Sequence, residues 1–167
     1  MSVLEILKYP DPILRKQAKP VGIVDAKIKK FAQDMIETMY AAPGIGLAAP
    51  QVGESIRLIV VDITQKKEGP IVLINPKVIS SEGECFEEEG CLSVPDLKEP
   101  ILRKQKIFIK GLDIEGNTIQ ISADDLLAIV LQHEIDHLDG ILIIDRISNL
   151  KRDIYKKKLQ KKSKKEV

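Results

Sequence analysis

The sequence predicts a single α+β domain with a C-terminal helical extension. Helical and strand-like segments follow one another without an internal repeat or a long linker, and the 167 residues suit one domain. Apolar residues make up 44% and charged residues 31%, which excludes disordered and fibrous classes. The longest apolar run, Leu126 to Leu131, is far below the ~18 residues of a membrane helix. We therefore expect no membrane partner.

The N-terminal part predicts two helices. Asp11 followed by Pro12 is a helix start, with an acidic cap before proline at the first helical position. Asp25 can cap a second, longer helix that stops at Ala42-Pro43-Gly44. Its apolar residues recur at three- and four-residue steps along one face. They are Ile28, Phe31, Met35 and Met39.

Strand-like segments follow in the middle of the chain. Residues 56–63 and 71–74 are apolar and β-branched, as buried strands are. Asn75-Pro76 interrupts the second, so the continuation should lie at a sheet edge or a bend. Residues 82–90 carry glutamates at five of nine positions and are expected to form an acidic connector.

A hairpin and a buried helix come next. Residues 107–114 and 118–121 flank Glu115-Gly116-Asn117, which predicts a hairpin. Ser122 to Asp125 is a capping signal for a helix that ends at Gly140 and is apolar nearly all round.

The end of the chain predicts one more helix. Residues 141–144 form a short apolar segment, and Ser148 can cap the helix that follows. A thin apolar seam is expected under its many lysines. The seam consists of Leu150, Ile154 and Leu159.

The predicted buried helix contains both histidines of the chain. His133, Glu134 and His137 form the pattern H-E-x-x-H, which places two imidazoles one turn apart on one helix face. Burying two titratable rings and a carboxylate without a common purpose is costly. The pattern therefore predicts a metal site, with Glu134 placed to take a proton from water.

Elimination narrows the candidates for the third metal ligand. No third histidine exists, and the only glutamate after His137 is Glu166, in the basic tail. Cys85, Cys91 and upstream carboxylates remain. A thiolate would complete a His2Cys set with an open fourth position, as in catalytic sites. Cys91 follows Gly90, so its backbone can approach a metal closely, whereas Cys85 lies among acids. An inert buried thiol is the alternative for Cys91.

Three segments of the chain stand out as sequence motifs. Residues 44–51 read GIGLAAPQ, residues 89–93 read EGCLS, and residues 133–140 read HEIDHLDG. Together they resemble the GxGLAAPQ, EGCLS and HExxHLxG motifs of peptide deformylases, all intact and in the family's order. The resemblance extends to Tyr9-Pro-Asp-Pro12 and leaves out only the lysine-rich tail. It implies mixed or antiparallel sheets packed around a central HExxH helix, with a C-terminal helix. A catalytic domain over 1–147 and a basic tail over 148–167 are expected.

The resemblance also implies an activity and a set of site residues. The expected reaction is hydrolysis of the N-formyl group from formyl-methionyl nascent peptides, which releases formate. By position, the metal ligands are Cys91, His133 and His137, and the general base is Glu134.

Further residues are implied by the same resemblance. Gln51 and the backbone N–H of Leu92 would form the oxyanion site with the metal. Without the other motifs, a turn residue after Pro50 would be the favoured interpretation of Gln51. The residues expected to bind substrate are Ile45, Gly46 and Gly90.

The metal and the compartment follow from different observations. A His2Cys set fits zinc by ligand type, while the family resemblance implies Fe2+ as the native ion, with Zn2+, Ni2+ or Co2+ in purified protein. Only two cysteines are present and the N-terminus shows no basic leader before a long apolar stretch. We therefore expect a cytoplasmic protein.

Two other functional classes are compatible with parts of the pattern. H-E-x-x-H alone is also typical of a metallopeptidase, although the third ligand differs from the common types. A non-catalytic metal-binding protein is the other alternative, and the presence of Glu134 disfavours it.

The net charge of +1 is distributed unevenly along the chain. Residues 151–167 carry nine Lys or Arg against two acids, a net +7, so the rest carries −6. A basic tail on an acidic body suggests a polyanion partner. With a nascent-chain substrate, ribosomal RNA is the hypothesis; a solvated, frayed terminus is the alternative.

Overall fold

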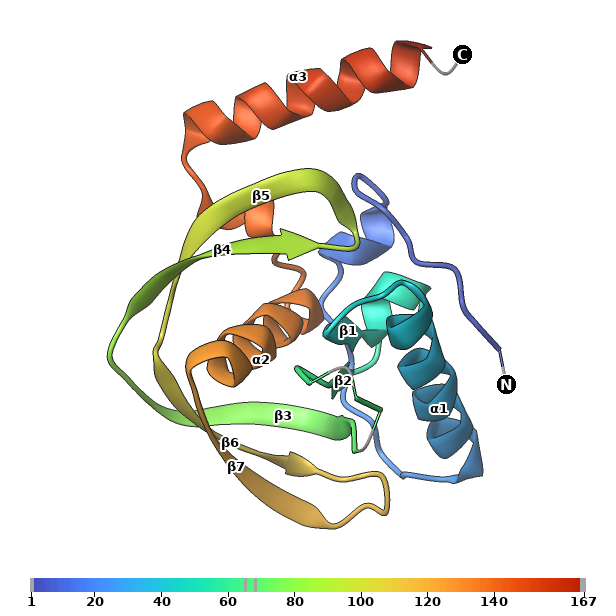
Figure 1. Cartoon of the computed structure of the whole chain (residues 1–167). Coiled ribbons are helices and arrows are strands. Elements are labelled where there is room, and N and C mark those ends of the chain that lie inside the picture. The colour runs from blue at the N-terminus through green and yellow to red at the C-terminus, as the bar shows by residue number, and fades with distance from the viewer. Residues whose placement is uncertain (1, 65, 68, 166–167) are drawn as a thin grey trace.

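Two antiparallel sheets enclose one helix in the computed structural model, which describes residues 2–64, 66–67 and 69–165. The larger sheet has the order β1-β2-β3-β6-β7, and the smaller consists of β4 and β5. The central helix of the protein, α2 (Asp125–Leu138), lies between the two sheets (Figure 1). The predicted α+β fold is confirmed. The strands are β1 (Gly46–Ala48), β2 (Leu58–Val61), β3 (Ile71–Glu82), β4 (Cys85–Cys91), β5 (Val94–Arg103), β6 (Lys106–Leu112) and β7 (Thr118–Asp124).

The helices begin where the sequence predicted. Asp11 accepts a hydrogen bond from the backbone of Ile13, and Asp25 accepts one from Ile28, each at 3.0 Å. Each carboxylate thereby satisfies an N–H that has no partner within its helix. Among the described residues, no helix has the length and apolar character needed to cross a membrane. The other helices are η1 (Pro12–Arg15), α1 (Ala26–Ala41), η2 (Ala49–Val52), η3 (Ile143–Arg146) and α3 (Asn149–Lys165).

The core has a cluster on each side of the larger sheet. α2 packs on one face, where Leu131 and Val130 meet Ile59 and Ile109. α1 covers the other face with the fully buried Met35. Because β-strand side chains alternate between faces, Ile59 serves one cluster and its neighbours Leu58 and Val60 the other. The central helix is therefore held against a rigid sheet.

The prediction of an acidic connector over residues 82–90 is wrong, because this segment contains β4. β4 pairs with β5 from Cys85–Arg103 to Gly90–Lys98. The glutamates do not prevent strand formation because Glu88 stays exposed, while the buried Glu89 is paired with Arg103. β5 had no counterpart in the sequence prediction.

The bend expected at Asn75-Pro76 is present, but the strand continues through it. The β3–β6 register shifts between Ile74 and Lys77. Asn75 has φ of 52°, a conformation that asparagine tolerates better than most residues. Its side-chain amide also holds both backbone polar groups of Val21, at 2.8 and 2.9 Å. Proline, which lacks an N–H, thus falls where the ladder is already irregular.

The start of α2 matches in position but not in its cap. The helix begins at Asp125, but its N-cap residue Asp124 makes no side-chain capping bond. β7 runs directly into the helix instead. At the other end, Gly140 adopts φ of 73°, which ends the helix as expected.

The apolar seam predicted for α3 is wrong in two of its three members. Ser148 caps the helix as predicted, but Leu150 is 71% exposed and Ile154 is 45% exposed. Tyr155, which is 6% exposed, and the partly buried Leu159 form the contact instead. They lie at i and i+4, so they share a face. The seam was misplaced because the packed face is set by Tyr155, whose hydroxyl donates to the Pro95 carbonyl 60 residues away.

Candidate metal and catalytic site

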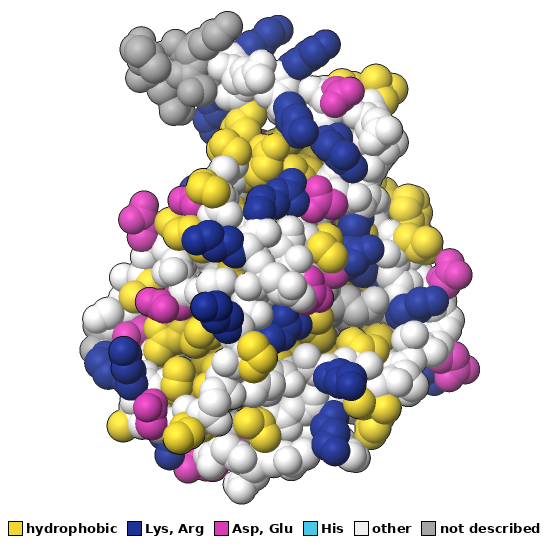
Figure 2. All heavy atoms as spheres, turned by 180° about the vertical axis from the view of Figure 1, so that it is seen from behind, with side chains coloured by type: hydrophobic (Ala, Val, Ile, Leu, Met, Phe, Trp, Pro, Cys, Tyr) yellow, Lys and Arg dark blue, Asp and Glu magenta, His cyan; other side chains and the backbone are white. Residues whose placement is uncertain are grey.

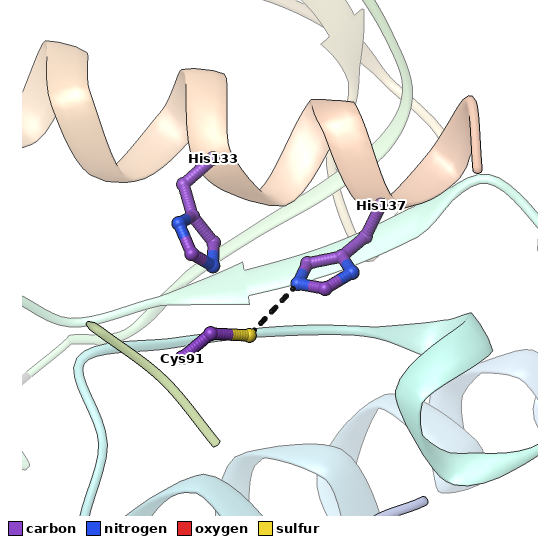
Figure 3. Close-up of side chains that lie close together, drawn as sticks. All are labelled: Cys91, His133 and His137. Atoms are coloured by element: carbon purple, nitrogen blue, oxygen red, sulfur yellow. Dashed lines mark hydrogen bonds between the residues drawn. The ribbon is translucent and has the colours of Figure 1, made fainter. Parts of the chain in front are cut away.

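Three side chains from two elements converge beside the central helix. His133 and His137 project from α2, and Cys91 reaches them from the end of β4 (Figure 3). Their potential ligand atoms all lie within 4.8 Å of one another. The Cys91 Sγ lies 3.3 Å from the His137 Nε2. This is a donor set of two imidazoles and one thiol.

The spacing of side chains along β4 and α2 explains why these residues meet. Two residues of a strand advance about 6.6 Å and four residues of a helix about 6 Å. A step of two along β4 therefore matches one turn of α2. Cys91 faces His137, and Glu89 faces His133 with 3.0 Å between its Oε1 and the Nδ1. The i, i+4 spacing of the histidines thus matches an i, i+2 spacing on the strand.

The two cysteines lie at opposite ends of β4. Cys85 lies six residues before Cys91 on β4, at the end of the strand near Asp125. It does not belong to the group that includes His133 and His137 among the described residues. Burial, Glu87, Glu89 and Asp125 raise the pKa of the Cys85 thiol. The geometry therefore agrees with Cys91, rather than Cys85, as the thiol of the cluster.

Glu134 is buried with one oxygen free of hydrogen bonds. The residue is 4% exposed, and its Oε1 has no hydrogen-bond partner among the described residues. Burial raises the pKa of Glu134 to about 7. A β-carbon at Gly46 would lie 2.5 Å from Glu134 Oε2. The absence of a side chain at Gly46 thus makes room for this carboxylate.

His133 is oriented by Glu89 and presents its other nitrogen to the cluster. Because Glu89 Oε1 lies on its Nδ1, the Nε2 is the ring nitrogen left for a ligand. Burial lowers the pKa of His133, but the Cys91 sulfur and Glu89 more than offset this, and the pKa is raised well above its usual value. The sulfur and carboxylate therefore create a potential that favours positive charge.

Gln51 has its amide fixed by two contacts. It lies on η2 and is 2% exposed. The backbone N–H of Ala48 can only donate, so it defines the Gln51 Oε1, at 2.9 Å. The Nε2 consequently points to the Ser93 hydroxyl, at 3.0 Å, and toward the Cys91 sulfur, at 3.8 Å. Gln51 thus lies in the η2 turn, and its Nε2 points toward the three-residue cluster.

These groups open onto one pocket of about 800 Å³. β1 is an edge strand of the larger sheet, and β4 belongs to a sheet of only two strands. The pocket contacts both, so it adjoins unpaired strand edges. All predicted site residues except the deeper His137 line it, including Ile45, Gly46, Gly90 and Leu92.

The donor set fits a divalent transition metal ion. Two imidazoles with one thiolate leave a fourth position open, which is the catalytic type of site. Burial lowers the pKa of His137 well below its usual value, so its ring is neutral, as a ligand must be. The potential that raises the pKa of His133 would equally favour a cation.

Comparisons with known proteins agree across nearly the whole chain. The polypeptide deformylase family model matches residues 3–153. A peptide deformylase of Thermodesulfovibrio yellowstonii is 53% identical over 164 residues, which cover 97% of this chain and 99% of that protein. The chain belongs to the peptide deformylase family. A relative from Nitrosococcus oceani, also a peptide deformylase, is 51% identical over 97% of both chains.

Solved peptide deformylases share the fold. The Legionella pneumophila structure superposes with a TM-score of 0.94 at 46% identity, covering 99% of this chain and 98% of that one. A structure from Ehrlichia chaffeensis, in complex with actinonin, gives 0.92 at 42% identity, with 97% and 98% coverage. The chain is thus a metal-dependent hydrolase that removes the N-formyl group from nascent peptides, as predicted.

The sequence prediction assigned no role to two residues near this site. Glu89 was quoted only as part of the EGCLS match, and Arg103 was not singled out. The structure places Glu89 against His133, and Arg103 against Glu89. A glutamate two residues before Cys91 was a usable signal, whereas its partner Arg103 lies 14 residues away on another strand.

Proposed function

We propose that Glu134 moves the proton in the deformylation reaction. It accepts a proton from water while the water oxygen bonds to the formyl carbon and the C=O electron pair moves onto the formyl oxygen. When that pair returns, the C–N bond breaks and Glu134 gives the proton to the leaving amine nitrogen. A free N-terminus and formic acid result, and the acid ionises to formate. The pKa of about 7 and the unpartnered Oε1 support this role.

Cys91, His133 and His137 would hold the metal ion, with Fe2+ as the native metal. When bound, the ion supplies Lewis acidity, which brings the pKa of water down toward about 7. The mixed sulfur and nitrogen donor set supports iron, zinc, nickel or cobalt over a hard cation such as magnesium. Elemental analysis of anaerobically prepared protein distinguishes them. A sample without any stoichiometric transition metal would contradict the ligand assignment.

Gln51 and Leu92 would stabilise the charge that develops on the formyl oxygen. The Gln51 Nε2 already points toward Cys91, and Leu92 lies in the two-residue turn directly after it. A side-chain amide donates without adding a charge. Pre-aligned donors of this kind are typically worth about 3–4 kcal/mol each.

The substrate backbone would lie extended between two strand edges. Ile45 and Gly46 line the pocket from the β1 side, and Gly90 lines it from β4. β1 is an edge strand of the larger sheet, so it could take a peptide as an added strand, with main-chain hydrogen bonds giving affinity.

The single observation that carries the proton-transfer proposal is the buried, unpartnered Glu134 oxygen beside the three-residue cluster. Glu134→Ala should lose at least about 100-fold in turnover of formyl-Met-Ala and should keep one metal ion per chain. Chelation of the wild type provides the matched loss of activity without a mutation. Retained activity in Glu134→Ala would contradict the role of general base.

The basic end of the chain, residues 148–167, would bind ribosomal RNA in the cytoplasm, where nascent chains emerge. Lys and Arg side chains gather on the described part of α3, which projects beyond the body (Figure 2). Lys161 and Lys162 are exposed there. Residues 1–147 would then act as the catalytic domain. Co-sedimentation with ribosomes that weakens steeply with salt supports this, and salt-independent binding contradicts it.

A further inference from the structure

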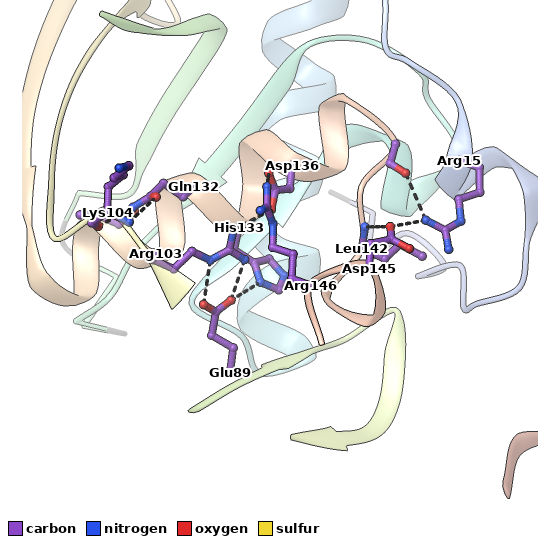
Figure 4. Close-up of polar contacts among 12 residues, drawn as sticks. Arg15, Glu89, Arg103, Lys104, Gln132, His133, Asp136, Leu142, Asp145 and Arg146 are labelled. Carbon is purple, nitrogen blue, oxygen red and sulfur yellow. Dashed lines mark hydrogen bonds and ion pairs between the residues drawn. The ribbon is translucent and has the colours of Figure 1, made fainter. Parts of the chain in front are cut away.

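A chain of ion pairs leads from the protein surface to a residue of the metal cluster. Arg146 on η3 binds Asp136 through two hydrogen bonds, Nε to Oδ2 at 2.6 Å and Nη2 to Oδ1 at 2.7 Å. Arg103 donates to the same Oδ2 at 2.6 Å and binds Glu89 at 2.8 and 2.9 Å. Glu89 then reaches the Nδ1 of His133 at 3.0 Å. Figure 4 shows this succession of side chains.

Arg103 is the buried centre of the chain. Its side chain is 3% exposed and bridges two carboxylates that stand on different elements, Glu89 on β4 and Asp136 on α2. These two elements also supply the ligand set, Cys91 from β4 and the histidines from α2. Arg103 therefore fixes the spacing between the strand and the helix on which the cluster depends.

Arg146 balances the charge of this clamp. Arg103 faces two carboxylates, so the group without Arg146 would carry one excess negative charge. Arg146, 38% exposed on its side chain, neutralises the outer carboxylate and holds both of its oxygens. Asp136 is only 13% exposed on its side chain, so without Arg146 this carboxylate would depend on Arg103, which also binds Glu89.

We propose that Asp136 and Arg146 are positioning residues for the metal site. They hold Arg103 against Glu89, and Glu89 in turn holds His133 in the orientation that presents its Nε2. The effect on His133 is indirect, through two intervening side chains. Residues that orient metal ligands from outside typically change metal affinity 10- to 100-fold when mutated. This inference rests on the proposed ligand set of Cys91, His133 and His137.

Arg15 provides a matched control for Arg146. Arg15 pairs with Asp145, the residue directly before Arg146, and its side chain is 40% exposed, close to the 38% of Arg146. Among the side-chain contacts of the described residues, neither Arg15 nor Asp145 touches Asp136. Arg15→Ala therefore loosens the same turn without breaking the chain that leads to His133.

Co2+ is the probe for the test. We expect Arg146→Ala to weaken Co2+ binding about 10-fold or more in competition with a chelator and to change the visible spectrum of the cobalt-thiolate centre. The kcat for formyl-Met-Ala should fall while KM stays within about twofold. Asp136→Asn should act in the same direction. Arg146→Lys, which keeps the charge, should recover part of the affinity.

The outcomes separate this inference from the proposed function. Wild-type affinity and spectrum in Arg146→Ala would overturn the positioning role, as would an equal loss in Arg15→Ala. If the unmodified chain bound no stoichiometric Co2+, the ligand assignment would fall, and the positioning role with it.

Discussion

Gly46 and Glu134 share a space that admits only one side chain. The position that a Gly46 β-carbon would take is 2.5 Å from Glu134 Oε2 and 2.9 Å from Val130 Cγ1. The glycine of the first motif is thus required by the glutamate of the third, 88 residues later in the chain. An edge strand and a central helix meet at this point.

Gly46→Ala should displace Glu134 and reduce kcat for formyl-Met-Ala by at least about tenfold, since small misplacements of catalytic groups are costly. Metal content should not change. Gly22→Ala is the control, because a β-carbon there meets nothing within 4 Å. Steady-state kinetics with metal analysis tests this. Wild-type kcat in Gly46→Ala would show that α2 can shift to accommodate the β-carbon without affecting catalysis by Glu134.

Gln51→Leu should lower kcat about 100- to 1000-fold with little change in KM, because it removes a donor used in the transition state. It also leaves the Ala48 N–H without its acceptor, so urea unfolding should show a stability loss of about 1–3 kcal/mol. Ser93→Ala removes only the hydroxyl that accepts from Gln51 and should cost less than about tenfold. Equal kcat losses in the two variants would argue against a donor role.

Two truncations should separate the charge of α3 from its packing. Ending the chain after Gln160 removes four lysines but keeps Tyr155 and Leu159, so stability should be unchanged and ribosome co-sedimentation should fall. Ending it after Leu150 also removes the buried Tyr155, whose hydroxyl donates to the Pro95 carbonyl at 2.8 Å. We expect that form to lose about 3 kcal/mol of stability. Equal co-sedimentation of the first form and the full chain would refute the tail hypothesis.

Alkaline pH should lower the free energy of unfolding, because two tyrosines have raised pKa values in the folded protein. Burial raises the pKa of Tyr40 and of Tyr155 to about 12, with added contributions from Asp62 and Asp96 respectively. The folded state holds these protons more tightly than the unfolded state, so the stabilisation is complete below about pH 10 and is lost as pH rises toward 12. The free energy of unfolding should fall over this range, and less steeply in Tyr155→Phe. Denaturant titrations across the range measure it; equal slopes would contradict the assignment.

Sequence reasoning reached the cluster because its signals were local. His133 and His137 are four residues apart on a predicted buried helix. Elimination left Cys85, Cys91 and upstream carboxylates, and the match to EGCLS singled out Cys91. β4 was missed because its glutamates suggested a solvated connector. What keeps Glu89 inside is Arg103, and a partner on another strand cannot be read from a stretch of nine residues.

The C-terminal helix shows a second limit of the same reasoning. Its cap at Ser148 was predictable because a cap is a contact between near neighbours in sequence. The face that packs was not, because Tyr155 meets Pro95, 60 residues away. Local chemistry sets where elements begin, while distant contacts decide which side is buried.

Because Cys91 and the two histidines stand on separate elements, a metal ion held by them would also affect folding. Cys91 and His133 are 42 residues apart in the sequence, so bringing them together in an unfolded chain would cost loop-closure entropy, and an ion held by both would bind the folded chain preferentially. No such arrangement pre-exists in an extended polypeptide, so binding energy becomes folding energy. The cofactor would act as a reversible cross-link between strand and helix, and its loss would lower the melting temperature as well as the rate.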